Sequence, residues 1–131
     1  MYISKGGFTL IELLVVISII AILSTIVMTS VSSQKKHAKD VSFQSTVDAI
    51  QKAAGACCST GTGVLNVALG GKVCAELDSN YPSSPSLGVV TIERGCDDID
   101  GYSIRLTPGT SNGGTIDYAL CDRDKCDFIN V

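Results

Sequence analysis

The hydrophobic and polar positions of the chain form three successive patterns. The first is an apolar run that begins at Phe8, in which Glu12 is the only charged residue before Ser32. Residues 13–31 form an uncharged stretch of 19 residues, and a run of about 18 such residues is long enough to span a membrane as a helix. The pattern therefore predicts a membrane-spanning helix with one acid near its start.

The second pattern begins at Ser32, where apolar residues recur with a helical period. Four of them are spaced four, three and four residues apart, which places them on one face of a helix. They are Phe43, Val47, Ile50 and Ala54. Because residues 8–54 contain neither glycine nor proline, we expect one continuous helix about 70 Å long. Gly55 is expected to end it.

The third pattern is a series of short β-like runs separated by turn residues. The runs are residues 89–93, 102–107, 115–121 and 126–131. Clusters of Gly, Pro, Ser and Asn separate them, which predicts an antiparallel meander. The expected fold class is α+β, in which the second half of the long helix packs on a small, disulfide-stapled antiparallel sheet.

All six cysteines lie beyond the predicted helix. They are Cys57, Cys58, Cys74, Cys96, Cys121 and Cys126. An even number of cysteines in a small domain behind a hydrophobic segment predicts disulfides made in an oxidising compartment. Cys121 and Cys126 flank a four-residue hairpin loop and are the pair we expect. The adjacent Cys57 and Cys58 are expected to reach different parts of the sheet, with Cys74 and Cys96 as partners in an order that the sequence leaves open.

Charge is distributed unevenly. Residues 55–131 hold ten acids against five bases, a net charge of −5, whereas residues 32–54 hold four lysines against two acids, a net charge of +2. An acidic head argues against binding to a nucleic-acid backbone. Lys35, Lys36 and Lys39 would favour a cytoplasmic location for the chain that follows the span. The cysteines favour the opposite side, and we give them the greater weight.

The residues around the start of the apolar run resemble a known signal. Lys5 and two glycines precede Phe8, and the sequence from Gly7 to Ile17 reads GFTLIELLVVI. This stretch resembles the class III signal of type IV pilins and the related pseudopilins. The resemblance implies cleavage after Gly7 by a membrane peptidase and N-methylation of the new terminus, Phe8. Many family members carry Gly or Pro in the span, which this chain lacks.

Glu12 is a candidate assembly residue. A carboxylate in an apolar segment is costly to bury, so we expect it to have a specific partner. After cleavage, the α-amine of Phe8 would lie one helical turn away, on the same chain or on a neighbouring one. Such a pair is strong only when both partners are present, so Glu12 would set the register between subunits. The alternative is an acid that reaches the membrane surface from near the end of the span.

Other chemistry has less support. The cysteines lack a C-x2-C spacing and His37 is the only histidine, so we expect no metal bound by thiolates and no cofactor. Residues 97–101 resemble half of a calcium loop but lack its closing Glu. With His37 beside the membrane, no Ser/His/Asp or Cys/His catalytic set can be formed. We expect the protein not to be an enzyme.

The sequence thus predicts four segments: a leader at 1–7, a transmembrane and filament-core helix at 8–31, its amphipathic continuation at 32–54 and a globular head at 55–131. The resemblance implies a structural subunit of a pilus-like filament, inserted in the bacterial inner membrane and then polymerised outside the cell. Implied partners are further copies of the chain, the prepilin peptidase, an assembly platform and an ATPase. The alternatives are a pseudopilin of a secretion or DNA-uptake system, a membrane-anchored binding domain that does not polymerise, and an anchored thiol redox protein.

Overall fold

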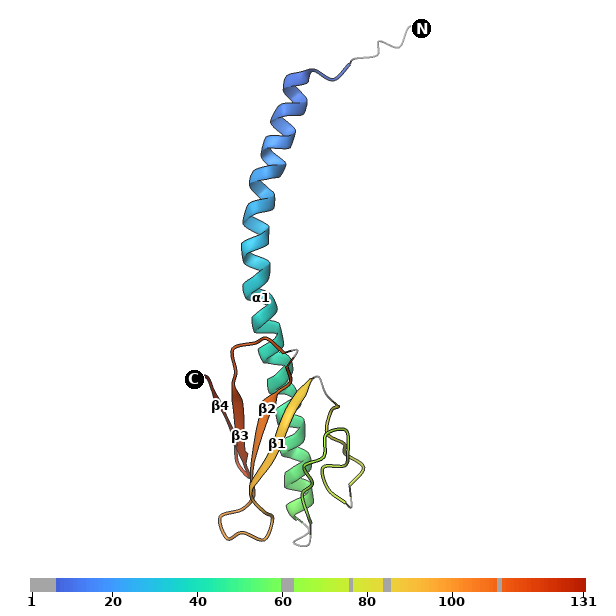
Figure 1. Ribbon diagram of the computed structural model, residues 1–131, viewed down its shortest axis with the longest axis vertical. Coiled ribbons are helices and arrows are strands. Elements are labelled where there is room, and N and C mark those ends of the chain that lie inside the picture. Colours follow the sequence, from blue (N-terminus) through green and yellow to red (C-terminus); the bar gives the residue numbers. More distant parts are fainter. Residues whose placement is uncertain (1–6, 60–62, 76, 84–85, 111) are drawn as a thin grey trace. The chain divides into compact units, whose positions relative to one another are not determined.

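The computed structural model describes residues 7–59, 63–75, 77–83, 86–110 and 112–131 (Figure 1). One helix, α1, precedes four strands in the chain. The elements are α1 (Leu10–Ser59), β1 (Leu87–Arg94), β2 (Ser103–Pro108), β3 (Tyr118–Asp122) and β4 (Cys126–Ile129). The chain divides into two units, the first ending at Lys35 and the second beginning at Lys36. A long apolar helix with a small antiparallel sheet and disulfides confirms the α+β prediction.

The first unit contains the apolar part of α1. Among the described residues, α1 is the one helix long and apolar enough to cross a membrane. Its hydroxyl groups bond to the helix itself: Ser18 Oγ donates to Leu14 O and Ser24 Oγ to Ile20 O, both at 2.8 Å. These bonds matter because lipid offers no partner for a polar group. This half of α1 can therefore enter an apolar environment without leaving these two hydroxyls unpaired.

The end of α1 differs from the prediction. The helix continues through Gly55 to Ser59, so the expectation that Gly55 ends it is wrong. Glycine in a helix interior costs about 1 kcal/mol relative to alanine. Burial of Ala54 and Cys57 offsets that cost, and disulfides anchor the last turn at Cys57 and Cys58. Packing and covalent links thus override the local preference.

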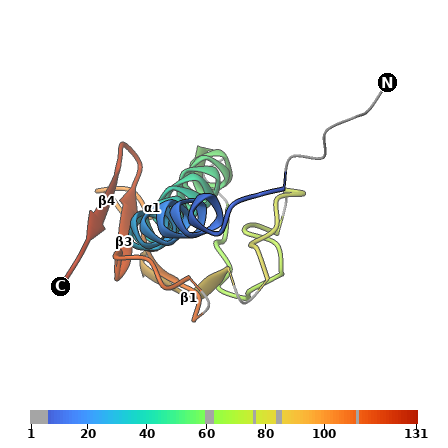
Figure 2. The ribbon, with the colours of Figure 1, turned by 90° about the horizontal axis from the view of Figure 1, so that it is seen from above.

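The core of the second unit lies between α1 and the sheet. The predicted stripe on α1 is confirmed, since all four of its side chains are at most 3% exposed. Leu87, Ile104 and Leu106 face it from the sheet and are fully buried. Phe43 also contacts Phe128 of β4 edge-to-face, with ring centroids 6.5 Å apart. Figure 2 shows the strands on one side of α1 and the loop that follows the helix on another.

The sheet is the predicted antiparallel meander, with strand order β1-β2-β3-β4. Two strands are shorter than expected: β3 begins at Tyr118 rather than at Thr115, and β4 ends at Ile129 rather than at Val131. The backbone N–H groups of Thr115 and Ile116 both donate to the Asp40 carboxylate on α1. Those two donors are therefore used to hold the segment against the helix.

Three disulfides connect the six cysteines: Cys57–Cys74, Cys58–Cys96 and Cys121–Cys126. The adjacent cysteines of α1 do diverge, but only Cys96 lies beside the sheet, in the turn after β1. Cys74 lies in the loop between α1 and β1, where it forms an isolated bridge with Leu65, so the expectation that both cysteines reach the sheet is wrong. None of the six cysteines has a free thiol, an arrangement that gives no support to the thiol redox alternative.

Candidate processing and assembly site

The candidate site begins where α1 begins. Thr9 is the N-cap residue, and its backbone N and Oγ1 donate to Glu12 Oε2 at 2.9 and 2.8 Å. In return, Glu12 N donates to Thr9 Oγ1 at 3.4 Å. This reciprocal arrangement is a capping box, which satisfies backbone donors that the first helical turn leaves unpaired. The carboxylate of Glu12 therefore stabilises the start of the helix in the uncleaved chain.

Sequence reasoning did not identify the cap, although the signal was present. Thr9 and Glu12 have the Thr-x-x-Glu spacing that marks a capping box. The prediction from sequence pairs the carboxylate with the α-amine of Phe8 instead. In the uncleaved chain Phe8 N belongs to a peptide bond and no such amine exists, so that pairing stays a prediction for the processed protein.

Gly7 and Phe8 are accessible beside this cap. No atom lies within 4 Å of the position that a Cβ on Gly7 would occupy, and the Phe8 side chain is exposed. Phe8, Glu12 and three aliphatic side chains line an open groove on the helix surface. The structure thus brings the three predicted site residues together at an accessible helix start.

The apolar half of α1 has no cover within the chain. Every large apolar side chain that the structure describes between Leu10 and Val31 is at least 38% exposed. An apolar surface of this extent marks contact with a membrane or with other protein chains. Lipid and the helices of other subunits are the two environments that suit it.

The half calcium loop at residues 97–101 is a turn held by its own groups. Asp98 Oδ1 accepts the Asp100 N–H at 3.1 Å, Gly101 N donates to Asp98 O at 3.0 Å, and Asp100 forms an exposed ion pair with Arg94 at 3.6 Å. Within the described parts of the chain, no group of three His, Cys, Asp or Glu side chains is arranged to hold a metal ion. Turn formation accounts for these aspartates.

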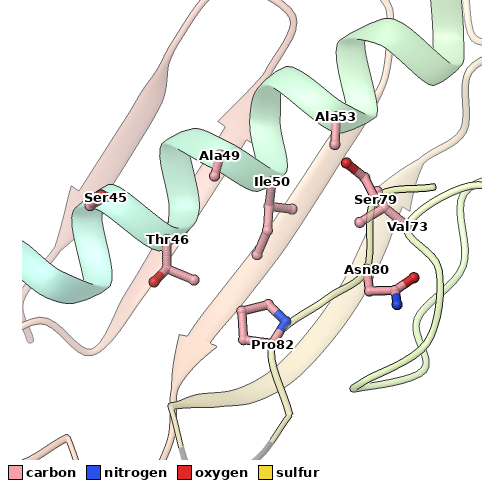
Figure 3. Close-up of a pocket in the computed structure, with 9 residues that line it drawn as sticks. All are labelled: Ser45, Thr46, Ala49, Ile50, Ala53, Val73, Ser79, Asn80 and Pro82. Carbon is pink, nitrogen blue, oxygen red and sulfur yellow. The ribbon is translucent and has the colours of Figure 1, made fainter. Parts of the chain in front are cut away.

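A cavity of about 320 Å³ lies between α1 and the loop after it (Figure 3). Small residues of the helix, among them Ala49 and Ala53, face Ser79 and Asn80 of the loop. The nine described lining residues include no charged side chain. Thr46 Oγ1 donates to Ser42 O at 3.0 Å within the helix. The cavity offers hydroxyl and amide groups but no acid or base, so it gives no support to catalysis.

Comparison with known proteins bears on the start of the chain. Residues 4–28 match the family model described as the prokaryotic N-terminal methylation motif. No curated protein and no solved structure matched the chain. The match covers the candidate cleavage site, the capping box and most of the apolar run, and it ends before the head.

The matched motif and the long apolar helix together define a class, the membrane-anchored precursors that carry a class III prepilin signal. The match confirms the resemblance to type IV pilins and pseudopilins over the start of the chain and supports a pilin-like or pseudopilin-like precursor. The motif points to a structural protein rather than an enzyme.

Proposed function

We propose that this protein is a structural subunit of a type IV pilus-like surface filament. The observation that carries the proposal is the methylation motif at residues 4–28 in front of a helix whose apolar side chains have no cover within the chain. In the precursor, lipid covers this helix. In the filament, most of the same surface packs against the helices of other copies.

Processing takes place at the start of that helix. The peptidase cleaves the bond between Gly7 and Phe8, and Phe8 becomes the methylated terminus. The open space around Gly7 supports access to the bond. Because Thr9 and Glu12 follow the cleaved bond, the capping box can persist after the leader has left.

After cleavage, Glu12 also takes part in assembly. Its carboxylate has lone pairs left beyond the two hydrogen bonds from Thr9, so it can also accept from an ammonium group. When a subunit leaves the membrane, the α-amine of a neighbouring Phe8 meets Glu12 in an apolar surrounding. An ammonium–carboxylate pair there fixes the axial position of the incoming subunit.

The head forms the outer surface, where three disulfides link α1, the following loop and the sheet. Disulfides stabilise a small domain mainly by restricting its unfolded chain. That suits a filament outside the cell. It also favours a surface pilus over the pseudopilin alternative, and the assembly platform, ATPase and peptidase of such a system are the proposed partners.

Mass spectrometry of the mature N-terminus tests the proposal. We expect a methylated Phe8 terminus in cells with a prepilin peptidase, and the full precursor in cells without one. Gly7→Val should block processing and leave the head folded, because no atom lies within 4 Å of the position of the new Cβ. Electron microscopy of sheared surface material should then show filaments only for the processed chain. An intact Met1 in the peptidase-containing cells would support an anchored domain that does not polymerise.

A further inference from the structure

An isoleucine is fully exposed on an ordered turn of the head. Ile99 lies between β1 and β2, and its side chain is 100% exposed. Asp97, Asp98 and Asp100 surround it in the sequence. Arg94 pairs with Asp100 at 3.6 Å, whereas Asp97 and Asp98 form no ion pair with a described residue. The Arg123 guanidinium also lies against this turn, beside Gly101. Three acids and two arginines leave the turn with one net negative charge beside an apolar side chain.

The turn is braced in several ways. The Cys58–Cys96 disulfide fixes its first part to the end of α1. Asp98 accepts the Asp100 N–H, and Gly101, at φ +82°, donates to Asp98 O. A braced loop loses little conformational entropy when it binds a partner. The exposed Ile99 contributes nothing to the core, so a contact outside the chain is the use that its position offers.

The first unit carries a surface of complementary character. Val27, Met28 and Val31 line an open groove on α1, with Ser32 and Lys35 at one end. Lys36 follows directly, and no described residue forms an ion pair with Lys35 or Lys36. The groove thus offers apolar side chains next to positive charge.

Within one chain, the β1–β2 turn lies too far from Lys36 to contact it. Lys36 and Cys58 both lie on α1 in the second unit and are separated by about 33 Å at 1.5 Å per residue. The disulfide holds the turn beside Cys58. A contact between the acidic turn and the basic end of the groove therefore needs a second copy of the chain.

We propose that the β1–β2 turn of one subunit docks on the groove of another, with Ile99 against Val27, Met28 and Val31. The Asp97 and Asp98 carboxylates then face Lys35 and Lys36. This inference rests on the proposed function and adds a contact made by the head. The two surfaces differ from each other, so the contact is heterologous, and repeated heterologous contacts produce an open filament when their rotation does not close into a ring. The charge pairs select the orientation of the incoming subunit.

Zero-length carbodiimide cross-linking of intact filaments, followed by mass spectrometry, tests the contact directly. We expect Lys35 or Lys36 joined to Asp97 or Asp98 of another subunit, and no such product from detergent-solubilised monomer. Charge reversal gives an independent test. Lys35→Glu and Asp97→Lys should each lower filament yield about tenfold, because like charges then meet, and the double variant should recover most of that loss.

The control is Lys52→Glu, an exposed lysine on α1 distant from the groove, which should assemble as the wild type does. Ile99→Ser tests the apolar part and should also lower yield.

Filaments that lack the cross-link, with a double variant no better than the singles, would overturn this inference and leave the proposed function standing. Wild-type chain that is processed but forms no filament would overturn the proposed function itself. Should Lys35→Glu act only by weakening attachment of the precursor to anionic vesicles, the partner would be lipid and the proposed contact would be wrong.

Discussion

Asp40 of α1 and Thr115, 75 positions later in the chain, are joined by two hydrogen bonds. The Thr115 backbone N–H and hydroxyl donate to the two carboxylate oxygens at 2.8 and 2.7 Å, and Ile116 N donates to one of them at 3.3 Å. Asp40 is only 8% exposed. Burial alone would raise its pKa, but the three hydrogen bonds, with a contribution from His37, hold the pKa below its usual 3.8. The charged carboxylate thus attaches the β2–β3 connection to the helix.

Removing this carboxylate should destabilise the head. Asp40→Ala leaves three donors without their acceptor, and we expect the free energy of unfolding to fall by about 3 kcal/mol. Asp48→Ala, which removes an exposed acid from the same helix, is the matched control and should have little effect. Urea unfolding of the detergent-solubilised chain with its disulfides intact measures both. Equal losses in the two variants would contradict the assigned role.

Gly114 is coupled to the same carboxylate. A Cβ on Gly114 would overlap Asp40 Oδ1, so Gly114→Ala must push the chain away from the helix and weaken these hydrogen bonds. In the Asp40→Ala background there is no carboxylate to displace. The cost of Gly114→Ala should therefore be smaller there by about 1 kcal/mol or more. Additive costs in a double-mutant cycle would show that the glycine is needed for another reason.

Acid should weaken the head through Asp40. The folded state holds this carboxylate at a lowered pKa, so the unfolded chain binds a proton first as the pH falls. The stability that Asp40 supplies is complete above about pH 5 and is lost as the pH falls through its folded pKa. Asp40→Asn should show a flatter profile of unfolding free energy against pH. Some dependence should remain, because backbone N–H groups of Lys125 and Asp124 also lower the pKa of Asp122. Superimposable profiles would contradict this prediction.

Two buried tyrosines differ in whether their hydroxyl group has a hydrogen-bond partner. The Tyr102 hydroxyl donates to Gln51 O at 2.9 Å, whereas the Tyr81 hydroxyl has no hydrogen-bond partner among the described residues, and burial raises the pKa of Tyr81 to about 12. Tyr102→Phe should cost about 1 kcal/mol, and Tyr81→Phe should be close to neutral.

The raised pKa of Tyr81 means that wild-type stability falls as the pH rises from 10.0 towards about 12. Tyr81→Phe should show a smaller loss rather than none, because burial also raises the pKa of Tyr102. A cost equal to that of Tyr102→Phe would reveal a partner for the Tyr81 hydroxyl.

Local patterns in the sequence predicted the elements of the fold. The helical face of Phe43 and Val47, the β-like runs and the Cys121–Cys126 spacing each involve neighbours in sequence or across one hairpin. Residue spacing alone is therefore enough to predict the helix face, the strands and this disulfide. The cap formed by Thr9 and Glu12 is equally local, and its Thr-x-x-Glu spacing predicts it as well.

Contacts between residues far apart in the sequence cannot be predicted from such local patterns. Asp40 resembles any other charged residue of a solvated helix, and only the folded chain brings Thr115 to it. The helix passes Gly55 because burial and disulfides outweigh a local preference. The pairing of Cys57 with Cys74 likewise depends on the path of the intervening loop. These features depend on tertiary packing, which single-residue propensities do not encode.

The last prediction separates the two uses of Glu12. Glu12→Gln keeps an oxygen that can accept from Thr9 but removes the charge, whereas Thr9→Val keeps the charge and removes the capping hydroxyl. Loss of the cap should cost about 1 kcal/mol of helix stability and leave assembly intact. Loss of the charge should leave membrane insertion and the folded head unchanged but lower filament yield at least about tenfold, because a buried ammonium then lacks its partner. Filament yield, processing and membrane content of both variants are measured side by side. Normal filaments from Glu12→Gln would remove the register role, and an equal loss in Thr9→Val would assign the effect of Glu12 to the cap.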